Sequence, residues 1–195
     1  MFYLSGGTAL AEFYCRHRYS DDLDFFTGDQ PFPQLDIEAA VAGFKAGMHA
    51  GSVVYRKLYD RRIFFLRKGR EELKLEFTYF PFTQIRPAKK RGGILVDSLE
   101  DIAANKFMAL IDRIEAKDFV DLYFIISEGG LPLKKIAALA AKKFSIKMDA
   151  LALGSELSKV RALTVLPKMI KKISLHELKD FFSNEAKQLK RAVLR

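Results

Sequence analysis

The chain has 195 residues, of which 49% are apolar and 29% charged, a balance that excludes an intrinsically disordered protein. Its single cysteine, Cys15, excludes an intrachain disulfide and a cysteine-based zinc site, and we expect it to be a buried apolar residue on the first helix. The apolar runs are too short to span a membrane and the first residues do not form a signal peptide, so we expect a cytoplasmic protein without membrane contact.

The net charge of +9 is concentrated at the C-terminal end of the sequence. Residues 159–195 contain ten cationic side chains and three acidic ones, a local excess of +7. Such a surface attracts a polyanion with little regard to its sequence, although solvated helices are also often rich in lysine. Charge alone therefore leaves nucleic-acid binding open.

The first half of the chain shows alternating strand and helix patterns. In order, we expect a strand at 2–4, a helix at 8–18, a strand at 22–26, a helix at 36–49, and strands at 52–58, 62–66 and 73–77. Short polar turns at 59–61 and 68–70 predict that the last three strands are consecutive and antiparallel. This half reads as a mixed α/β unit.

After Pro81 the pattern becomes mostly helical. A short strand at 94–96 precedes helices expected from Ser98 to about 115, at 118–127, 133–144, 147–162 and 175–193. Ser98 followed by Asp101 is an imperfect capping box for the first of these helices. We place a soft domain boundary near residue 97, between a sheet-containing lobe at 1–97 and a helical lobe at 98–195 with basic C-terminal helices.

A glycine pair opens the first helix, directly after the first strand, at Gly6, Gly7 and Thr8. Backbone N–H groups exposed at such a turn can cradle an anion. Paired glycines are common in turns, so the pair is informative because of its position before the Asp-x-Asp strand. Ser20, just ahead of that strand, either donates to a phosphate or caps the turn.

Three carboxylates lie on predicted strands, at Asp22, Asp24 and Glu76. Asp22 and Asp24 share one strand face, and Glu76 completes a cluster if its strand is a neighbour. Hard oxygen ligands of this kind suit Mg²⁺ or Mn²⁺. Alternatively, the aspartates are solvated strand-end acids, and Glu76 pairs with Arg62 or Lys74.

A second group of charged residues follows on the predicted helices at 98–115 and 118–127. Lys106 lies on an amphipathic helix, where it either serves the site or is a solvent-exposed lysine. Asp118 and Asp121 share a helix face; they order Arg113 and Lys117, assist a reacting hydroxyl, or form surface pairs. The three histidines have no metal-ligand spacing, and we expect them to be structural or solvated.

Together these blocks resemble the nucleotidyltransferase fold, specifically the AbiEii-type toxin family of type IV toxin–antitoxin and abortive-infection systems. The resemblance covers residues 4–122. It rests on Gly-Gly-Thr, Arg-x-Ser-x-Asp-Leu-Asp-Phe-Phe, Lys-x-Glu, and the 105–109 and 117–122 blocks, with Lys117 where an arginine is usual. It implies an α+β, polymerase-β-like mixed sheet with flanking helices, followed by a helical lobe.

The resemblance also implies a reaction. Two Mg²⁺ (or Mn²⁺) ions on Asp22, Asp24 and Glu76 would bind a nucleoside triphosphate, and an acceptor hydroxyl would attack the α-phosphorus and expel pyrophosphate. Catalytic roles would fall to these acids with Lys106, Asp118 and Asp121. The nucleotide-binding residues would be Gly6, Gly7, Thr8, Arg18, Ser20 and Lys106.

The family leaves three functions open. In the first, the acceptor is an RNA, with a tRNA 3′ end favoured, and the protein is a toxin with a cognate antitoxin. In the second, the acceptor is a small hydroxylated molecule. In the third, the chain is a catalytically silent binding module. The basic tail favours RNA, and the intact acids argue against a silent module. Family members usually have helical residues ahead of Gly-Gly-Thr, so we expect a short member or a sequence that starts late, as a monomer or weak dimer.

Overall fold

A computed structural model describes residues 1–147 and 149–193. Its contacts divide the chain into two compact units. Unit 1 comprises Met1–Ala9 and Ser20–Asp97, and unit 2 comprises Leu10–Tyr19 together with the residues from Ser98 onward. Residues 10–19, which we expected in the first lobe, thus group with the helical part of the chain.

Unit 1 contains a seven-stranded mixed sheet with the strand order β3-β4-β5-β2-β1-β7-β6. Its strands are β1 (Tyr3–Ser5), β2 (Asp22–Thr27), β3 (Ser52–Leu58), β4 (Arg61–Lys68), β5 (Glu71–Tyr79), β6 (Lys89–Arg91) and β7 (Ile94–Val96). Strands β3, β4 and β5 are consecutive and antiparallel, as predicted. Strand β2 pairs with β5 in parallel and with β1 antiparallel, which puts the Asp-x-Asp strand at the centre of the sheet.

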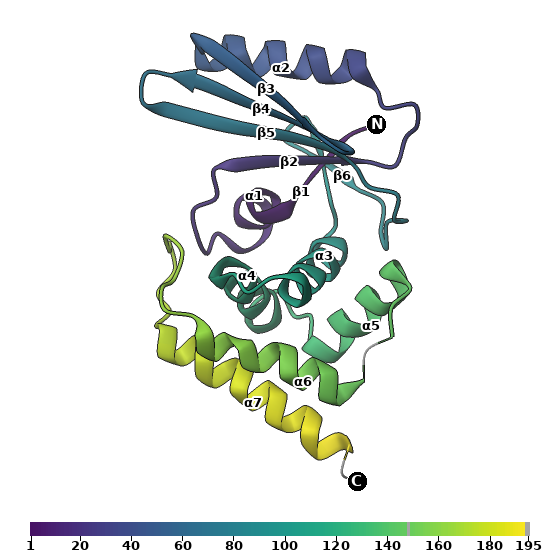
Figure 1. Cartoon of the computed structure of the whole chain (residues 1–195), viewed down its shortest axis with the longest axis vertical. Helices are drawn as coiled ribbons and strands as arrows, with labels where there is room; N and C mark the ends of the chain where they lie inside the picture. Colours follow the sequence, from purple (N-terminus) through teal and green to yellow (C-terminus); the bar gives the residue numbers. More distant parts are fainter. Residues whose placement is uncertain (148, 194–195) are drawn as a thin grey trace. The chain divides into compact units, whose positions relative to one another are not determined.

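Large apolar side chains from both sides of this central pairing form the core of unit 1. Phe25 and Phe77 are directly paired across β2 and β5, and their rings stack with centroids 5.2 Å apart. Helix α2 (Gln34–Met48) runs along β3, β4 and β5 and buries Ile37 completely (Figure 1). The packed Phe25 anchors β2 in the sheet next to its polar residues.

The first predicted helix is short and changes its winding. Helix α1 (Gly6–Leu10) continues as a π-helical turn, η1 (Ala11–Cys15), and ends at Arg16 in the left-handed conformation. Cys15 is buried on this turn, as expected, and burial raises the pKa of its thiol to about 11. A thiol with this pKa is protonated at neutral pH and is a poor nucleophile.

Unit 2 is helical apart from its loops. Its helices after residue 97 are α3 (Leu99–Asp112), α4 (Ala116–Ser127), α5 (Leu133–Phe144), α6 (Ala150–Ser158), the 3₁₀ turn η2 (Lys159–Ala162) and α7 (Leu175–Val193). Helices α6 and α7 pack side by side (Figure 1), and Phe182 of α7 meets Phe119 of α4 edge to face at 5.2 Å. Ser98 caps α3 by accepting a hydrogen bond from the Asp101 N–H at 3.0 Å, as predicted.

The remaining differences from the predicted elements are local. Strand β6 was not predicted, because its sequence Lys89–Arg91 is basic rather than apolar. Met148, inside the helix expected at 147–162, and residues 194–195, at the end of the predicted lobe, lie outside the described residues. Among the helices described, none combines the length and apolar character needed to cross a bilayer.

Candidate active site

The three predicted carboxylates lie on one face of two neighbouring strands in unit 1. Asp24 on β2 is directly paired with Glu76 on β5, and Asp22 is paired with Lys74. Directly paired residues of adjacent strands point to the same side, and so do residues two apart on one strand. The sequence predicted a carboxylate cluster on the condition that the strand of Glu76 neighbours that of the two aspartates. The structure meets this condition.

Two cations from the same unit hold Glu76. Arg61 donates to Glu76 Oε1, and Lys74 Nζ lies 3.1 Å from Glu76 Oε2 and 3.2 Å from Asp22 Oδ2. Burial opposes ionisation of Glu76, but the hydrogen bonds and charges of Arg61 and Lys74 outweigh burial and lower its pKa. Burial likewise opposes the ammonium of Lys74, but Glu76 and the two aspartates outweigh it and raise the pKa of Lys74. Sequence reasoning gave the Lys74 pair as one alternative, and the arginine is Arg61 rather than Arg62.

Whether this arrangement fits a divalent cation depends on Glu76. Among the described residues, no three His, Cys, Asp or Glu side chains are grouped so as to hold a metal ion. Asp22 and Asp24 supply hard oxygen donors on one strand face, which suits Mg²⁺ or Mn²⁺. Glu76 is also an oxygen donor, and it lies on the same face of the sheet. Its carboxylate is already in ion pairs, so it can become a third ligand only if its contact with Lys74 is broken. The three-ligand set stays a prediction.

The turn between β1 and α1 packs directly against Asp24. Ser5 is paired with Asp24 across β1 and β2, and Gly6 follows with a φ of +71°. A Cβ atom at Gly6 would lie 2.4 Å from Asp24 Oδ2, closer than any real contact. Only glycine fits this position, and the backbone of the glycine pair therefore lies beside the carboxylate, as the sequence indicated.

Replacing Gly6 with alanine tests this close approach. We expect Gly6→Ala to lower the free energy of unfolding by about 2 to 4 kcal/mol, because left-handed backbone strain of about 1 to 2 kcal/mol adds to the clash with Asp24. Gly92→Ala is the matched control, since Gly92 also has a positive φ (+54°) but open space around it. Urea denaturation measures both. Equal losses in the two variants would show that the Asp24 contact costs nothing.

Thr8 joins the start of α1 to the loop before β2. Its hydroxyl lies 3.0 Å from Ser20 Oγ and 3.2 Å from the Ser20 carbonyl oxygen, and it also donates to the carbonyl oxygen of Asp22. These contacts fix the loop that leads into the Asp-x-Asp strand. The side chains of Thr8 and Ser20 thus act on each other here, while their predicted phosphate contacts stay predictions.

Asp97 is a buried acid of unit 1 that the sequence reading did not single out. Ser5 Oγ donates to Asp97 Oδ2 at 2.8 Å, Gln84 Nε2 donates to Oδ1 at 3.0 Å, and the Asp97 N–H donates to the carbonyl oxygen of Leu4 at 2.9 Å. It ties β1, and with it the glycine turn, to the end of β7. The sequence offered one signal for this residue, its position directly after the apolar strand 94–96. An ordinary acidic residue in a turn occupies the same kind of position, so the signal was not specific.

In unit 2, Asp121 is the centre of a buried network of cations. Arg18 donates to both of its oxygens, from Nε at 2.6 Å and from Nη2 at 2.8 Å. Lys106 Nζ lies 2.7 Å from Oδ2, and His17 Nε2 lies 2.7 Å from Oδ1. Burial opposes ionisation of Asp121, but Lys106, Arg18 and His17 outweigh it and hold its pKa far below the usual range.

Asp118 binds the same lysine from the next position on the α4 face. Lys106 Nζ donates to Asp118 Oδ1 at 3.1 Å, and Arg113 donates to Asp118 from Nε at 2.8 Å and Nη2 at 3.3 Å. Burial disfavours the ammonium of Lys106, but Asp121 and Asp118 outweigh it and raise its pKa. Arg113 Nε also lies 3.5 Å from Glu115 Oε1, so a third carboxylate borders the cluster.

These contacts exclude two of the interpretations that the sequence left open. Lys106 is only 7% exposed and Asp118 and Asp121 are fully buried, so the solvated-lysine and surface-pair alternatives are wrong. Asp118 does order Arg113, as one alternative held, whereas Lys117 pairs with Glu115 at 2.8 Å. His17 is structural, and sequence reasoning missed its link to Asp121 because 104 residues separate the two.

The lowered pKa of Glu76 predicts acid sensitivity. A carboxylate with a depressed folded pKa adds stability that is complete above its unfolded pKa of about 4.3 and is lost as the pH falls through the folded value. We therefore expect the free energy of unfolding to fall below about pH 4, and Glu76→Gln to reduce that slope by up to about 1.4 kcal/mol per pH unit. Urea titrations at several pH values measure this. Glu72→Gln, at a surface pair with Arg67, is the control; an equal reduction there would contradict the assignment.

Solved structures share the arrangement of the sheet and helices. JHP933 of Helicobacter pylori superposes with a TM-score of 0.62 at 22% identity, over 98% of this chain and 84% of that protein. A candidate nucleotidyltransferase of H. pylori gives 0.60 at 20% identity, over 98% and 87%. At these identities the likeness concerns the fold alone. The fold is the α+β nucleotidyltransferase fold, a mixed sheet with flanking helices.

The family follows from the sequence itself. The profile described as "Nucleotidyl transferase AbiEii toxin, Type IV TA system" matches residues 1–194, and the chain belongs to this family. A protein of Aquifex aeolicus (strain VF5), described as uncharacterised, is 34% identical over 148 residues. That match covers 73% of this chain and 66% of the relative, just under two thirds of its length.

Proposed function

We propose that the chain transfers a nucleoside monophosphate from a nucleoside triphosphate to the 3′-terminal hydroxyl of an RNA, with tRNA the favoured acceptor. In this reaction the hydroxyl oxygen bonds to the α-phosphorus and pyrophosphate leaves. The observation that carries the proposal is the contact of the Gly6 backbone with the Asp24 carboxylate on the central strand. It joins an anion-binding type of turn to an acid that can hold a cation, as transfer from a triphosphate requires.

Each part of the site has a role in this proposal. Asp22 and Asp24 would hold Mg²⁺ or Mn²⁺, with Glu76 as a further ligand. The ion would neutralise the triphosphate and polarise the reacting oxygens. The backbone of Gly6, Gly7 and Thr8 would bind phosphate oxygens. When no metal is bound, the positive charge of Lys74 would offset the negative charges of the acids. This reduces the repulsion among three carboxylates that lie close together.

In this proposal the buried network of unit 2 orders two cationic side chains. In this proposal Asp118 and Asp121 are positioning residues, because each is buried and paired with cations. They hold Lys106 and Arg18, whose charges would offset those of the triphosphate. Membership of a type IV toxin family further suggests that a cognate antitoxin restrains the activity.

The test uses RNA with and without a free 3′ end. The protein is incubated with Mg²⁺, each α-³²P-labelled nucleoside triphosphate and total tRNA, and the RNA is separated on a denaturing gel. We expect label on RNA with at least one nucleotide, and none when periodate has first destroyed the 3′-terminal diol. Label that survives periodate treatment would contradict the 3′-end acceptor, and absence of label with every nucleotide would contradict RNA as the acceptor.

A further inference from the structure

The segment just ahead of the Asp-x-Asp strand is clamped by the loop that precedes α7. The N–H groups of Ile170 and Lys171 donate to the carbonyl oxygen of His17 at 2.9 and 3.0 Å, and the Tyr19 N–H donates to the carbonyl oxygen of Lys168 at 2.9 Å. Arg18 and Met169 form an antiparallel bridge between these bonds. Two stretches about 150 residues apart in sequence are thus held as a short ribbon within unit 2.

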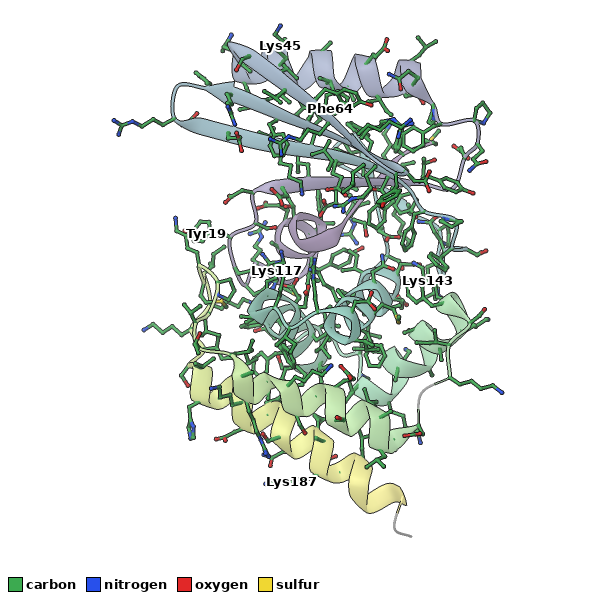
Figure 2. The ribbon with its side chains drawn as sticks, in the orientation of Figure 1. Tyr19, Lys45, Phe64, Lys117, Lys143 and Lys187 are labelled. Atoms are coloured by element: carbon green, nitrogen blue, oxygen red, sulfur yellow. The ribbon has the colours of Figure 1, made fainter. Side chains whose placement is uncertain are left out.

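This ribbon presents an exposed aromatic ring beside a cation. Tyr19 is 50% exposed, and Lys168 Nζ lies 4.5 Å from the centroid of its ring. Figure 2 shows Tyr19 beside the tip of the loop that leads into α7. Ile170 and Lys172, on the same loop, are also exposed. Apolar and basic side chains thus lie together on the surface of unit 2, and they are not part of its buried core.

The backbone behind the ring is rigid. Arg18 Nη1 donates to the carbonyl oxygen of Tyr19 at 2.9 Å, and the same guanidinium is anchored on the fully buried Asp121. A ring on a fixed backbone loses little conformational freedom when a ligand stacks on it. Lys168 can contact one face of the ring, and half of the residue still remains exposed.

These properties match the way proteins bind single-stranded nucleic acid, in which aromatic rings stack on bases and lysines follow the phosphates. We propose that Tyr19, Lys168 and Lys172 bind single-stranded RNA, with Tyr19 stacked on a base and the two ammonium groups beside the flanking phosphates. The proposal rests on the proposed function, in which RNA is the acceptor. The positive charge of the chain, +9 overall, complements such a partner and disfavours a basic protein or peptide.

Binding is measured without a nucleoside triphosphate, so that it does not depend on catalysis. The probe is a short fluorescein-labelled single-stranded oligoribonucleotide, and the readout is fluorescence anisotropy at several salt concentrations. We expect Tyr19→Ala to raise Kd by roughly 5- to 150-fold and Tyr19→Phe to leave it nearly unchanged, because stacking uses the ring. Lys168→Gln should lower the slope of log K against log salt by about 0.7, the value for one phosphate contact with a single strand.

Matched variants elsewhere on the surface separate this site from general effects. Tyr59, which is 87% exposed on the β3–β4 turn, gives Tyr59→Ala, and the exposed Lys45 of α2 (Figure 2) gives Lys45→Gln. Both should bind the probe like the wild type. Equal Kd values for Tyr19→Ala and the wild type would overturn the proposal. So would a higher KM for the nucleoside triphosphate with an unchanged Kd for the probe, which would assign the ring to the nucleotide.

The outcome also separates this surface from the proposed function. Tyr19-dependent binding of the probe by a protein that transfers no nucleotide would support the surface and overturn the transfer reaction. Transfer to RNA with binding that is insensitive to Tyr19 and Lys168 would support the reaction and overturn the surface.

Discussion

Asp24→Asn should reduce nucleotide transfer by about a thousandfold or more, with little change in folding. The substitution removes the negative charge that would hold a divalent cation, and that cation supplies several kcal/mol of charge stabilisation during transfer. Asparagine has nearly the same volume as aspartate, so the close contact with Gly6 is kept. Initial rates of label transfer to RNA measure the loss, and thermal unfolding checks the fold.

Asp21→Asn is the matched control for this variant. Asp21 is exposed and precedes the strand, so its carboxylate is outside the β2 face shared by Asp22 and Asp24. We expect wild-type rates from it. Comparable activity in Asp24→Asn and Asp21→Asn would mean that the carboxylate on β2 does not serve the reaction, and the proposed site would have to lie elsewhere.

Asp121→Asn should have the largest effect on stability. Its loss removes the carboxylate that binds Nε and Nη2 of Arg18 and one of the two carboxylates that bind Lys106, and breaking a buried pair costs about 3 to 5 kcal/mol. That is a large share of the roughly 5 to 15 kcal/mol by which a domain is stable. Urea denaturation followed by circular dichroism should show a lower midpoint, and transfer activity should fall with it.

Two further variants separate charge from packing in this network. Asp118→Asn should cost less, because its partner Arg113 has a side chain that is 45% exposed and can turn to water. In a double-mutant cycle, adding Lys106→Met to Asp121→Asn should recover part of the lost stability, since it removes a buried ammonium that has lost one of its two carboxylates. The double variant should stay inactive if Lys106 serves the triphosphate. An Asp121→Asn protein as stable as the wild type would contradict the network.

Local pattern was enough to place the carboxylates on their strands. Alternation with a period of two put Asp22 and Asp24 on one face, and the polar turns at 59–61 and 68–70 led to the antiparallel order of β3, β4 and β5. The glycine pair was informative because its position, between a strand and a helix, constrains backbone geometry. A prediction of this kind succeeds where neighbours in space are neighbours in sequence.

Contacts between distant segments could not be read in this way. The parallel pairing of β2 with β5 sets Lys74 beside Asp22, and a lysine within a strand gives no sign of this contact with a residue 52 positions away. The link of His17 to Asp121 joins residues that are 104 positions apart. The ribbon of Tyr19 and Lys168 depends on a loop without apolar periodicity. Such contacts follow from tertiary packing, which overrides local preference.

The position of the label in the nucleoside triphosphate tests the central claim most directly. The wild-type protein is given Mg²⁺ and tRNA with the same triphosphate labelled either at the α- or at the γ-phosphate. Nucleotidyl transfer predicts that α-label appears on the RNA and that γ-label is released as pyrophosphate. Transfer of γ-label to the RNA, or release of γ-label as inorganic phosphate without α-label on any acceptor, would contradict it.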